Sequence, residues 1–162
     1  VELNSNTINK YELITETGHL KLDRVGYSSL AYPFAYGCIP RTWDEDGDPL
    51  DIEIVSVTEP LIPGSIVEAR IIGVMKFDDG GEVDDKVIAV LSDDKRMEHI
   101  KSFEDLGPHW IKETTYYWEH YKDLKKPGTC KVNGFLGIEA AIKVIEDCEE
   151  RYKKDIEPNL ID

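Results

Sequence analysis

The chain contains few cysteines and no long hydrophobic segment. Its 162 residues include three cysteines, which are far apart and form no Cys-x-x-Cys pair, so a reducing compartment is the simple interpretation. No apolar run approaches about 18 residues, the length that a membrane helix needs, and the first residues form no apolar signal segment. We therefore expect a cytoplasmic protein that does not associate with membranes.

Positive charge is also scarce. The sequence has 19 Lys and Arg residues against 33 Asp and Glu residues, which gives a formal net charge of −14. This balance argues against nucleic acid or an anionic membrane as a partner. It is compatible with a small phosphate ligand if cations and a few basic side chains converge locally. The length, the 41% apolar content and the lack of a linker or repeat predict a single globular domain over residues 1–162.

The first two-thirds of the chain indicate short β-strands separated by turns. Residues 11–14 and 20–22 alternate polar and apolar on either side of Glu16-Thr17-Gly18, which is typical of a hairpin. Further strands are predicted at 52–57, 65–75 and 87–91. We expect the last two to be joined through a tight turn at Gly80-Gly81.

The last third changes to a helical period. One helix is predicted to begin at Gly107-Pro108, since proline suits the first helical position, and a second to begin near Ile138. The second helix has an apolar stripe at intervals of three and four residues: Ile138, Ala141, Ile142, Ile145, Cys148 and Tyr152. Cys148 is therefore predicted to lie in the core. Short strands followed by two helices indicate a small β-barrel with helices packed on it.

Acidic residues are densest at one turn just before the strand predicted at 52–57. The cluster comprises Asp44, Glu45, Asp46, Asp48 and Asp51. Such carboxylates repel one another, so they lie on a solvated loop or are held together by cations, and hard ions such as Mg²⁺ prefer oxygen ligands. An EF-hand loop starting at Asp44 does not fit, because its sixth residue is Pro49 and its twelfth is Val55. The turn alone leaves both alternatives open.

A second acidic cluster flanks the turn at Gly80-Gly81. It comprises Asp78, Asp79, Glu82, Asp84 and Asp85. A two-residue turn places Asp79 opposite Glu82 and Phe77 opposite Asp84, so carboxylates gather at one end of the hairpin. If the strands are neighbours, that end faces the first acidic turn. Spacing alone does not fix which carboxylates point inward, and a solvated turn is the simpler alternative.

Four cationic residues, Lys10, Arg24, Lys86 and Lys122, lie in distinctive local sequences. Each alone is compatible with an ordinary surface charge. Arginine offers a planar fork that matches phosphate, and lysine offers a compact charge. The tyrosine-rich segment 27–37 adds hydroxyl donors.

Taken in order, these motifs resemble the soluble family I inorganic pyrophosphatases of prokaryotic type. The matching segments are Lys10-Tyr11-Glu12, Asp23-Arg24, Tyr32-Pro33, Tyr36-Gly37, residues 46–52, residues 73–86 and residues 120–124. The resemblance covers essentially the whole chain. It implies a five-stranded closed β-barrel of OB type with two main α-helices. It also implies Mg²⁺-dependent hydrolysis of pyrophosphate to two orthophosphates. The other class of pyrophosphatases, the DHH phosphoesterase type, is not indicated, because the sequence contains no Asp-His-His motif.

The resemblance also implies a role for each matching residue. The Mg²⁺ ions that hold and acidify the attacking water would be ligated by Asp46, Asp51 and Asp84, and Asp51 would bridge these ions. Asp79 would join Asp84 on a further ion. Glu12 and Glu2 would lie in the outer shell of the ions. Asp48 would be the general base. Phosphate oxygens would be bound by Lys10, Arg24, Tyr36, Lys86, Tyr121 and Lys122. Asp44 and Glu45 receive no role, and no cysteine or serine is needed as a nucleophile.

Two positions depart from the family pattern. Glu2 lacks the proline that usually follows it two residues later, since Asn4 stands there. Tyr116 occupies the position where many bacterial members have a histidine at a subunit contact. The resemblance implies a homohexamer, built as a dimer of trimers, and Tyr116 would change a detail of that contact.

Two other functions remain as alternatives. One is an OB-type module that binds a cation or nucleic acid without catalysis, although the charge and the lack of a basic aromatic strand face weigh against nucleic acid. The other is a Mg²⁺-dependent phosphoesterase for organic phosphates, which would need a pocket for the organic group. No feature of the sequence is assigned to such a pocket.

Overall fold

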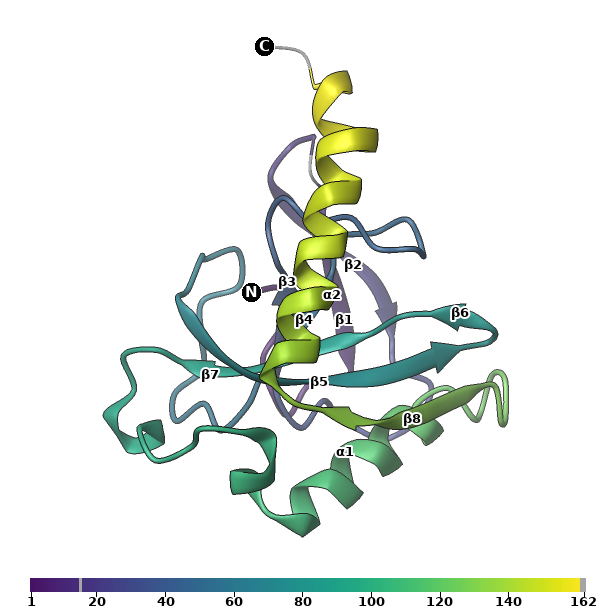
Figure 1. The fold of residues 1–162 in the computed structure, drawn as a ribbon. Coiled ribbons are helices and arrows are strands. Elements are labelled where there is room, and N and C mark those ends of the chain that lie inside the picture. Colours follow the sequence, from purple (N-terminus) through teal and green to yellow (C-terminus); the bar gives the residue numbers. More distant parts are fainter. Residues whose placement is uncertain (15, 161–162) are drawn as a thin grey trace.

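The computed structural model describes residues 1–14 and 16–160, and within them the fold is mainly β with two main helices (Figure 1). The strands are β1 Asn9–Ile14, β2 His19–Val25, β3 Ala35–Cys38, β4 Asp51–Ile54, β5 Ala69–Asp79, β6 Glu82–Val83, β7 Lys86–Leu91 and β8 Cys130–Leu136. The helices are α1 Pro108–His120 and α2 Ile138–Arg151, with short helical turns at Lys95–Met97, Phe103–Leu106, Tyr152–Ile156 and Glu157–Asn159. The predicted mainly-β class with two helices is confirmed.

The larger sheet is organised around β5, its longest strand. The order is β3-β4-β7-β5-β6, and β8 also pairs with β5. Among the described strands only β4 and β7 pair in parallel, which aligns Asp51 directly with Lys86. Asp79 pairs with Glu82 as predicted, and the turn between them places Gly80 and Gly81 at φ +71° and +98°. Such positive φ angles favour glycine, so the turn sequence fixes the hairpin that carries the second acidic cluster.

The predicted closed five-stranded barrel is not confirmed. In the described residues β1 and β2 pair only with each other, and the larger sheet has free ends. Backbone groups on the outer edge of β3 are already used, because the Leu3 and Tyr36 amides donate to each other's carbonyl oxygens at 3.1 and 3.0 Å. The N-terminal segment therefore covers the edge at which a further strand would close the sheet.

Predicted strand limits differ from the observed ones where the backbone turns. The strand predicted to reach residue 57 ends at Ile54, and Ser56 adopts a left-handed conformation with φ +57°. The strand predicted at 65–75 runs from Ala69 to Asp79, since pairing with β8 extends to the acidic end of the hairpin. Strands β3 and β8 were not predicted.

The two helices pack on the larger sheet. Helix α2 lies across β5 and its C-terminal end extends beyond the sheet, while α1 lies beside β8 (Figure 1). Cys148 is fully buried, as predicted, but Ile138 and Ile142 of the same stripe stay exposed. Helix α1 contributes Tyr117 and Trp118 to an aromatic core with Phe34 and Phe77. No helix in the described part of the chain has the length and apolar character to cross a membrane.

Candidate active site

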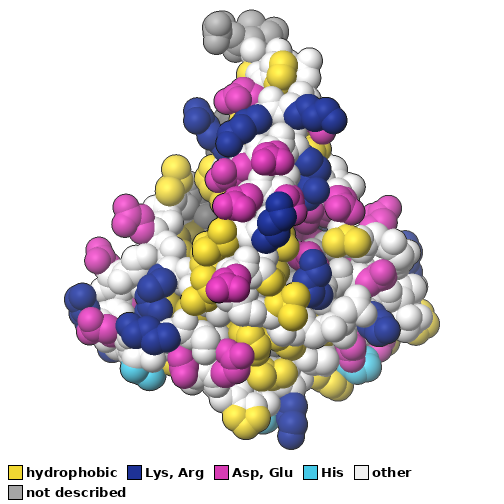
Figure 2. Space-filling view, in the orientation of Figure 1, with side chains coloured by type: hydrophobic (Ala, Val, Ile, Leu, Met, Phe, Trp, Pro, Cys, Tyr) yellow, Lys and Arg dark blue, Asp and Glu magenta, His cyan; other side chains and the backbone are white. Residues whose placement is uncertain are grey.

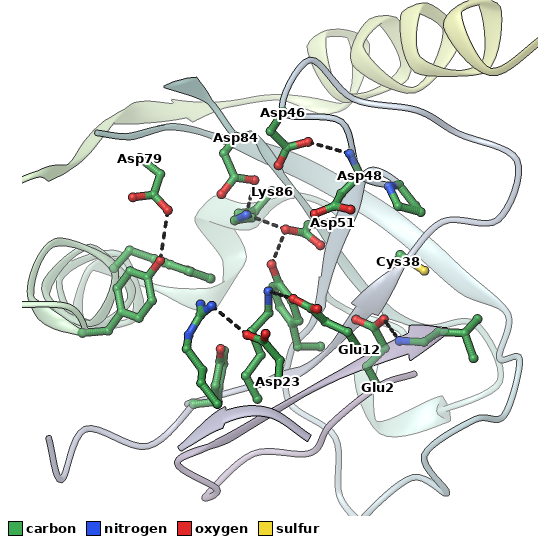
Figure 3. Close-up of a pocket in the computed structure, with 18 of the residues that line it drawn as sticks. Glu2, Glu12, Asp23, Cys38, Asp46, Asp48, Asp51, Asp79, Asp84 and Lys86 are labelled. Carbon is green, nitrogen blue, oxygen red and sulfur yellow. Dashed lines mark hydrogen bonds and ion pairs between the residues drawn. The ribbon is translucent and has the colours of Figure 1, made fainter. Parts of the chain in front are cut away.

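A single cavity of about 290 Å³ collects the residues that the sequence singled out (Figure 3). All thirteen predicted site residues line it: Glu2, Lys10, Glu12, Arg24, Tyr36, Asp46, Asp48, Asp51, Asp79, Asp84, Lys86, Tyr121 and Lys122. They come from the N-terminal segment, the β1–β2 hairpin, strand β3, the acidic turn that leads into β4, the segment from β5 to β7 and the end of α1. Segments far apart in the sequence therefore meet at one polar site.

Two carboxylates on the sheet share one buried lysine. Asp51 begins β4, Asp84 lies two residues before Lys86, the first residue of β7, and Lys86 is 1% exposed. The Lys86 ammonium donates to Asp51 Oδ2 at 2.6 Å and to Asp84 Oδ1, and the Tyr36 hydroxyl also donates to Asp51. Burial disfavours the charged ammonium, but Asp51 and Asp84 outweigh this and raise the pKa of Lys86. Lys86 therefore stays charged.

Three aromatic rings, those of Tyr36, Phe77 and Trp118, form an aromatic box next to the Lys86 ammonium. Its Nζ lies 5.8 Å from the ring centroid of Tyr36, 5.6 Å from that of Phe77 and 5.1 Å from that of Trp118. A cation near an aromatic face is attracted to the ring quadrupole, and this attraction strengthens when water is excluded. The box thus offsets part of the cost of burying the charge and holds the lysine in place.

The acidic turn presents Asp46 and Asp48 to solvent without a cationic partner among the described residues. The Asp48 amide donates to Asp46 Oδ1 at 3.1 Å, which fixes the turn locally. Partial burial raises the pKa of Asp46 to about 6, and the nearby Asp84, Asp51 and Asp44 add to that effect. The pKa of Asp48 is also raised, first by burial and then by Glu12. Uncompensated negative charge therefore collects here.

Asp44, which received no role from the sequence, anchors this turn to α2. It is 6% exposed, and Arg151 donates to its Oδ1 at 2.8 Å. Arg151 Nε also donates to the Trp43 carbonyl at 2.9 Å, and the Trp43 amide donates to the Cys148 carbonyl at 2.9 Å. The C-terminal turn of α2 therefore holds the loop that carries Asp46 and Asp48.

On the opposite side of the site, the end of α1 pairs with Asp79. Lys122 donates to Asp79 Oδ2, and the Tyr121 hydroxyl lies 3.4 Å from the same oxygen. Burial raises the pKa of a carboxyl, but the contact with Lys122 outweighs it and lowers the pKa of Asp79. Asp79 is therefore held as a carboxylate.

The β1–β2 hairpin brings two cations side by side. Lys10 and Arg24 are cross-strand partners at a bulge, and each pairs with an adjacent acid: Lys10 with Glu12 at 2.6 Å and Arg24 with Asp23 at 2.9 Å. Like charges directly opposite one another on two strands are destabilising, so this arrangement suits an anionic ligand. Glu2 is only 9% exposed and accepts from the Leu13 amide at 2.9 Å, which ties the N-terminal segment to the hairpin.

The donor set fits hard divalent cations. Eight carboxyl side chains and four cationic ones line the cavity, and oxygen is the ligand atom that Mg²⁺, Mn²⁺ and Ca²⁺ prefer. No three acidic, histidine or cysteine side chains in the described residues already converge as a metal-ligand group. Lys86 and Lys122 instead pair with the carboxylates, as a cation would. The geometry defines a site for a small polyanion together with hard cations, the class that serves metal-assisted phosphoryl transfer.

Comparison with known proteins gives the family. The family model described as inorganic pyrophosphatase matches residues 1–153. The inorganic pyrophosphatase of Geobacillus stearothermophilus is 42% identical over 154 residues, which cover 95% of this chain and 92% of that protein. That of Neisseria meningitidis serogroup B is 44% identical, with 94% of this chain and 86% of that protein covered.

Solved structures agree with the sequence relatives. An inorganic pyrophosphatase from Neisseria gonorrhoeae superposes with a TM-score of 0.89 at 43% identity, covering 94% of this chain and 89% of that one. The Thermus thermophilus enzyme superposes with a TM-score of 0.87 at 39% identity, covering 94% and 88%. The chain belongs to the inorganic pyrophosphatase family.

The sequence reasoning missed some residues at the cavity. Asp23, Tyr32 and Trp118 line it, although none had been given a role there. Behind it lies Glu53, which is 0% exposed and accepts from Trp118 Nε1 at 2.6 Å. Burial raises the pKa of Glu53 to about 8. One signal was available: Glu53 stands two residues after Asp51, so a strand places both on the same face.

Proposed function

We propose that this chain hydrolyses inorganic pyrophosphate to two phosphates with Mg²⁺ ions held at the carboxylate cluster. Family membership over residues 1–153 supports the reaction. The observation that carries the site assignment is the convergence of carboxylates and cations from five separate segments on one cavity. Pyrophosphate is a dense anion, so its binding and attack both require that charge to be offset.

The carboxylates divide between direct and outer contacts with the ions. Asp46, Asp51 and Asp84 would hold the ions nearest the attacking water, Asp79 would join Asp84 on a further ion, and Glu12 and Glu2 would support them from the outer shell. When bound, the ions offset phosphate charge and lower the pKa of a water molecule. Lys86 already fixes Asp51 and Asp84 relative to each other, which supports their use as one unit.

Asp48 is proposed as the general base. Its side chain is exposed on the acidic turn, next to Asp46 but without an ion pair in the described structure. Nearby cations keep such a carboxylate ionised, so it takes a proton from the attacking water. The water oxygen bonds to one phosphorus, the bridging P–O bond breaks, and the second phosphate leaves with that electron pair. No protein nucleophile is required.

The basic and hydroxyl side chains are proposed to bind the two phosphates. This set comprises Lys10, Arg24, Tyr36, Lys86, Tyr121 and Lys122, and all six line the cavity. Lys10 and Arg24 approach from the hairpin, while Tyr121 and Lys122 approach from the end of α1. They would orient the substrate and neutralise charge that moves to the leaving phosphate, which are the main demands of phosphoryl transfer.

We also infer a single domain over residues 1–162 and a cytoplasmic location. Three free cysteines support a reducing compartment.

We further infer a homohexamer arranged as a dimer of trimers. Apolar side chains gather on the face around the N-terminal half of α2 (Figure 2), where Leu136, Ile138 and Ile142 are exposed. Such an apolar face suits a subunit contact. Sedimentation equilibrium tests this, since the hexamer has six times the mass of the 18.5 kDa chain.

A phosphate-release assay tests the proposed function. With Mg²⁺, pyrophosphate is expected to be hydrolysed, and chelation of the ion is expected to abolish turnover. Nucleotides and sugar phosphates serve as competing substrates. Faster turnover of those compounds would favour the phosphoesterase alternative. Cation binding without any turnover would favour the non-catalytic binding module.

A further inference from the structure

We propose that Glu53 is a positioning residue for the carboxylate pair, and that it acts through Trp118 and Lys86. The kinetic part of this inference rests on the proposed function. The structural part, a link from Glu53 to the Lys86 ammonium, does not depend on it. The link runs from a fully buried acid on β4 to the lysine that holds Asp51 and Asp84.

Glu53 occupies a position that stability alone does not favour. It is 0% exposed, and its Oε2 finds no hydrogen-bond partner among the described residues. Burying a carboxyl with an unpaired oxygen costs free energy, and apolar side chains of similar volume often replace buried polar pairs without loss. Its one side-chain hydrogen bond in the described structure, from Trp118 Nε1 to Oε1 at 2.6 Å, therefore points to a role in fixing the indole.

The indole is the aromatic ring nearest to the Lys86 ammonium. Its centroid lies 5.1 Å from Nζ, against 5.6 Å for Phe77 and 5.8 Å for Tyr36. Trp118 also packs against Phe77 with ring centroids 5.2 Å apart, so one edge is held by packing and the N–H edge by Glu53. A rotation of this ring changes the surface on which the ammonium rests.

Lys86 transmits that position to the carboxylates. Its ammonium lies 2.6 Å from Asp51 Oδ2 and also contacts Asp84, and at 1% exposure solvent does not substitute for the aromatic box. A shift of the ammonium therefore changes the separation and orientation of two proposed metal ligands. Groups that orient metal ligands from behind change metal affinity by about 10–100-fold when they are removed.

Four variants separate positioning from a purely structural role. Glu53→Gln keeps an oxygen acceptor for the indole N–H, whereas Glu53→Leu and Trp118→Phe each remove one partner and leave the other unpaired. The double variant removes both partners. Because a buried polar group left alone is costly, the losses in the free energy of unfolding of the two single variants should together exceed the loss in the double variant.

The first readout is the Mg²⁺ concentration that gives half-maximal pyrophosphate turnover. It is expected to rise about tenfold in Glu53→Leu, in Trp118→Phe and in the double variant, because each lacks an indole held by Glu53, and to stay within about threefold of the parent in Glu53→Gln. The turnover number at saturating Mg²⁺ should change less. If neither single variant alters the Mg²⁺ requirement while both lower the free energy of unfolding, the pair is structural only and the inference is wrong.

The second readout needs neither metal nor substrate. Aromatic ring currents displace the NMR signals of the Lys86 ε-methylene protons, which Lys86→Arg identifies by their loss. These signals should move in Glu53→Leu and keep their parental position in Glu53→Gln. Unchanged signals in Glu53→Leu would overturn the link. If the parent protein fails to hydrolyse pyrophosphate, the proposed function is wrong, and the Lys86 signals still decide the positioning role.

Discussion

Two pairs of aspartates face the same cavity but are held in different ways. Asp51 begins β4, Asp84 lies just before the adjacent parallel strand β7, and both share the ammonium of Lys86. Asp46 and Asp48 lie on an exposed turn, held by a backbone contact between them and by no ion pair in the described structure. The protein compensates part of the charge of the sheet pair through Lys86, and it supplies no ion pair to the loop pair in the described structure.

We infer from this difference that the sheet pair fixes the positions of the ions and that the loop pair takes part in cation capture and proton transfer. A half-buried pair that shares one buried ammonium keeps a fixed geometry, which suits ligands that must hold ions at constant positions. An exposed, uncompensated pair gains most from an added cation and has access to water, which suits cation capture and proton transfer. The predictions below test this division in order of the size of the expected effect.

Asp48→Asn is expected to have the largest effect, because it removes the proposed base while retaining the shape of the side chain. The turnover number at neutral pH should fall by about 10²–10⁴-fold. The Mg²⁺ concentration for half-maximal activity should remain within about threefold of the parent, since Asp48 is not a proposed ligand. Steady-state kinetics at varied Mg²⁺ measure both, and an unchanged turnover number would remove Asp48 as the base.

Asp51→Asn should affect the metal requirement itself. It weakens a proposed bridging ligand and also removes the negative charge from the acceptor shared by Lys86 and Tyr36. Half-maximal activity should then need about 10–100-fold more Mg²⁺. Asp93→Asn, an exposed acid outside the cavity, is the matched control and should behave as the parent. A parental Mg²⁺ dependence in Asp51→Asn would contradict the bridging role.

Arg151→Ala tests the anchor of the loop pair from a distance. It leaves the buried Asp44 carboxyl without its cation, so the free energy of unfolding should fall by about 1–3 kcal/mol. The acidic turn should also loosen, and the Mg²⁺ requirement should rise about threefold. Lys153→Ala, an exposed cation just past α2, serves as the control. Chemical denaturation and Mg²⁺ titration distinguish a loosened loop from a merely less stable helix.

A dependence on pH should distinguish the loop pair further. The pKa of Asp46 is raised to about 6, so protons compete with cations as the pH falls through that value. The Mg²⁺ requirement should therefore increase below about pH 6, approaching tenfold per pH unit. Asp46→Asn should need more Mg²⁺ at all pH values and lose this dependence. If the variant and the parent show the same profile, another group is responsible.

The burial of Glu53 behind the sheet pair predicts a smaller effect, a dependence of protein stability on pH that can be measured without metal. Its pKa is raised to about 8 in the folded protein from an ordinary value of 4.5. Between these values the folded state binds more protons than the unfolded state, so stability is present at low pH and is lost as the pH rises toward 8. Glu53→Gln should flatten this part of the profile, as measured by urea denaturation at several pH values.

The sequence predicted the elements that have strong local patterns. Both helices, the β1–β2 hairpin and the turn at Gly80-Gly81 follow from apolar period and turn chemistry. Strand β8 was missed because its regular structure comes from pairing with β5, and it contains Gly134 near an irregularity in that pairing. The open sheet was also missed, since the Leu3–Tyr36 bridge that covers β3 joins segments far apart in sequence.

For the site, the sequence predicted which residues line the cavity but not the contacts that hold those residues in place. Every predicted residue lines the cavity, and all except Glu2 belonged to a motif that the family resemblance ordered along the chain. The roles of these residues remain predictions. The support for Asp44 comes from Arg151 and that for Trp118 from Glu53, across 107 and 65 residues, so no local pattern announces either contact.

The most direct test of the central claim is anomalous diffraction from crystals grown with Mn²⁺, a hard cation that substitutes for Mg²⁺ at oxygen ligands. The account predicts anomalous peaks bounded by the carboxylates of Asp46, Asp51 and Asp84, with Lys86 remaining on the side of the aromatic box. The account would be contradicted if the protein hydrolyses pyrophosphate with Mn²⁺ but its crystals show no anomalous peak among these three carboxylates.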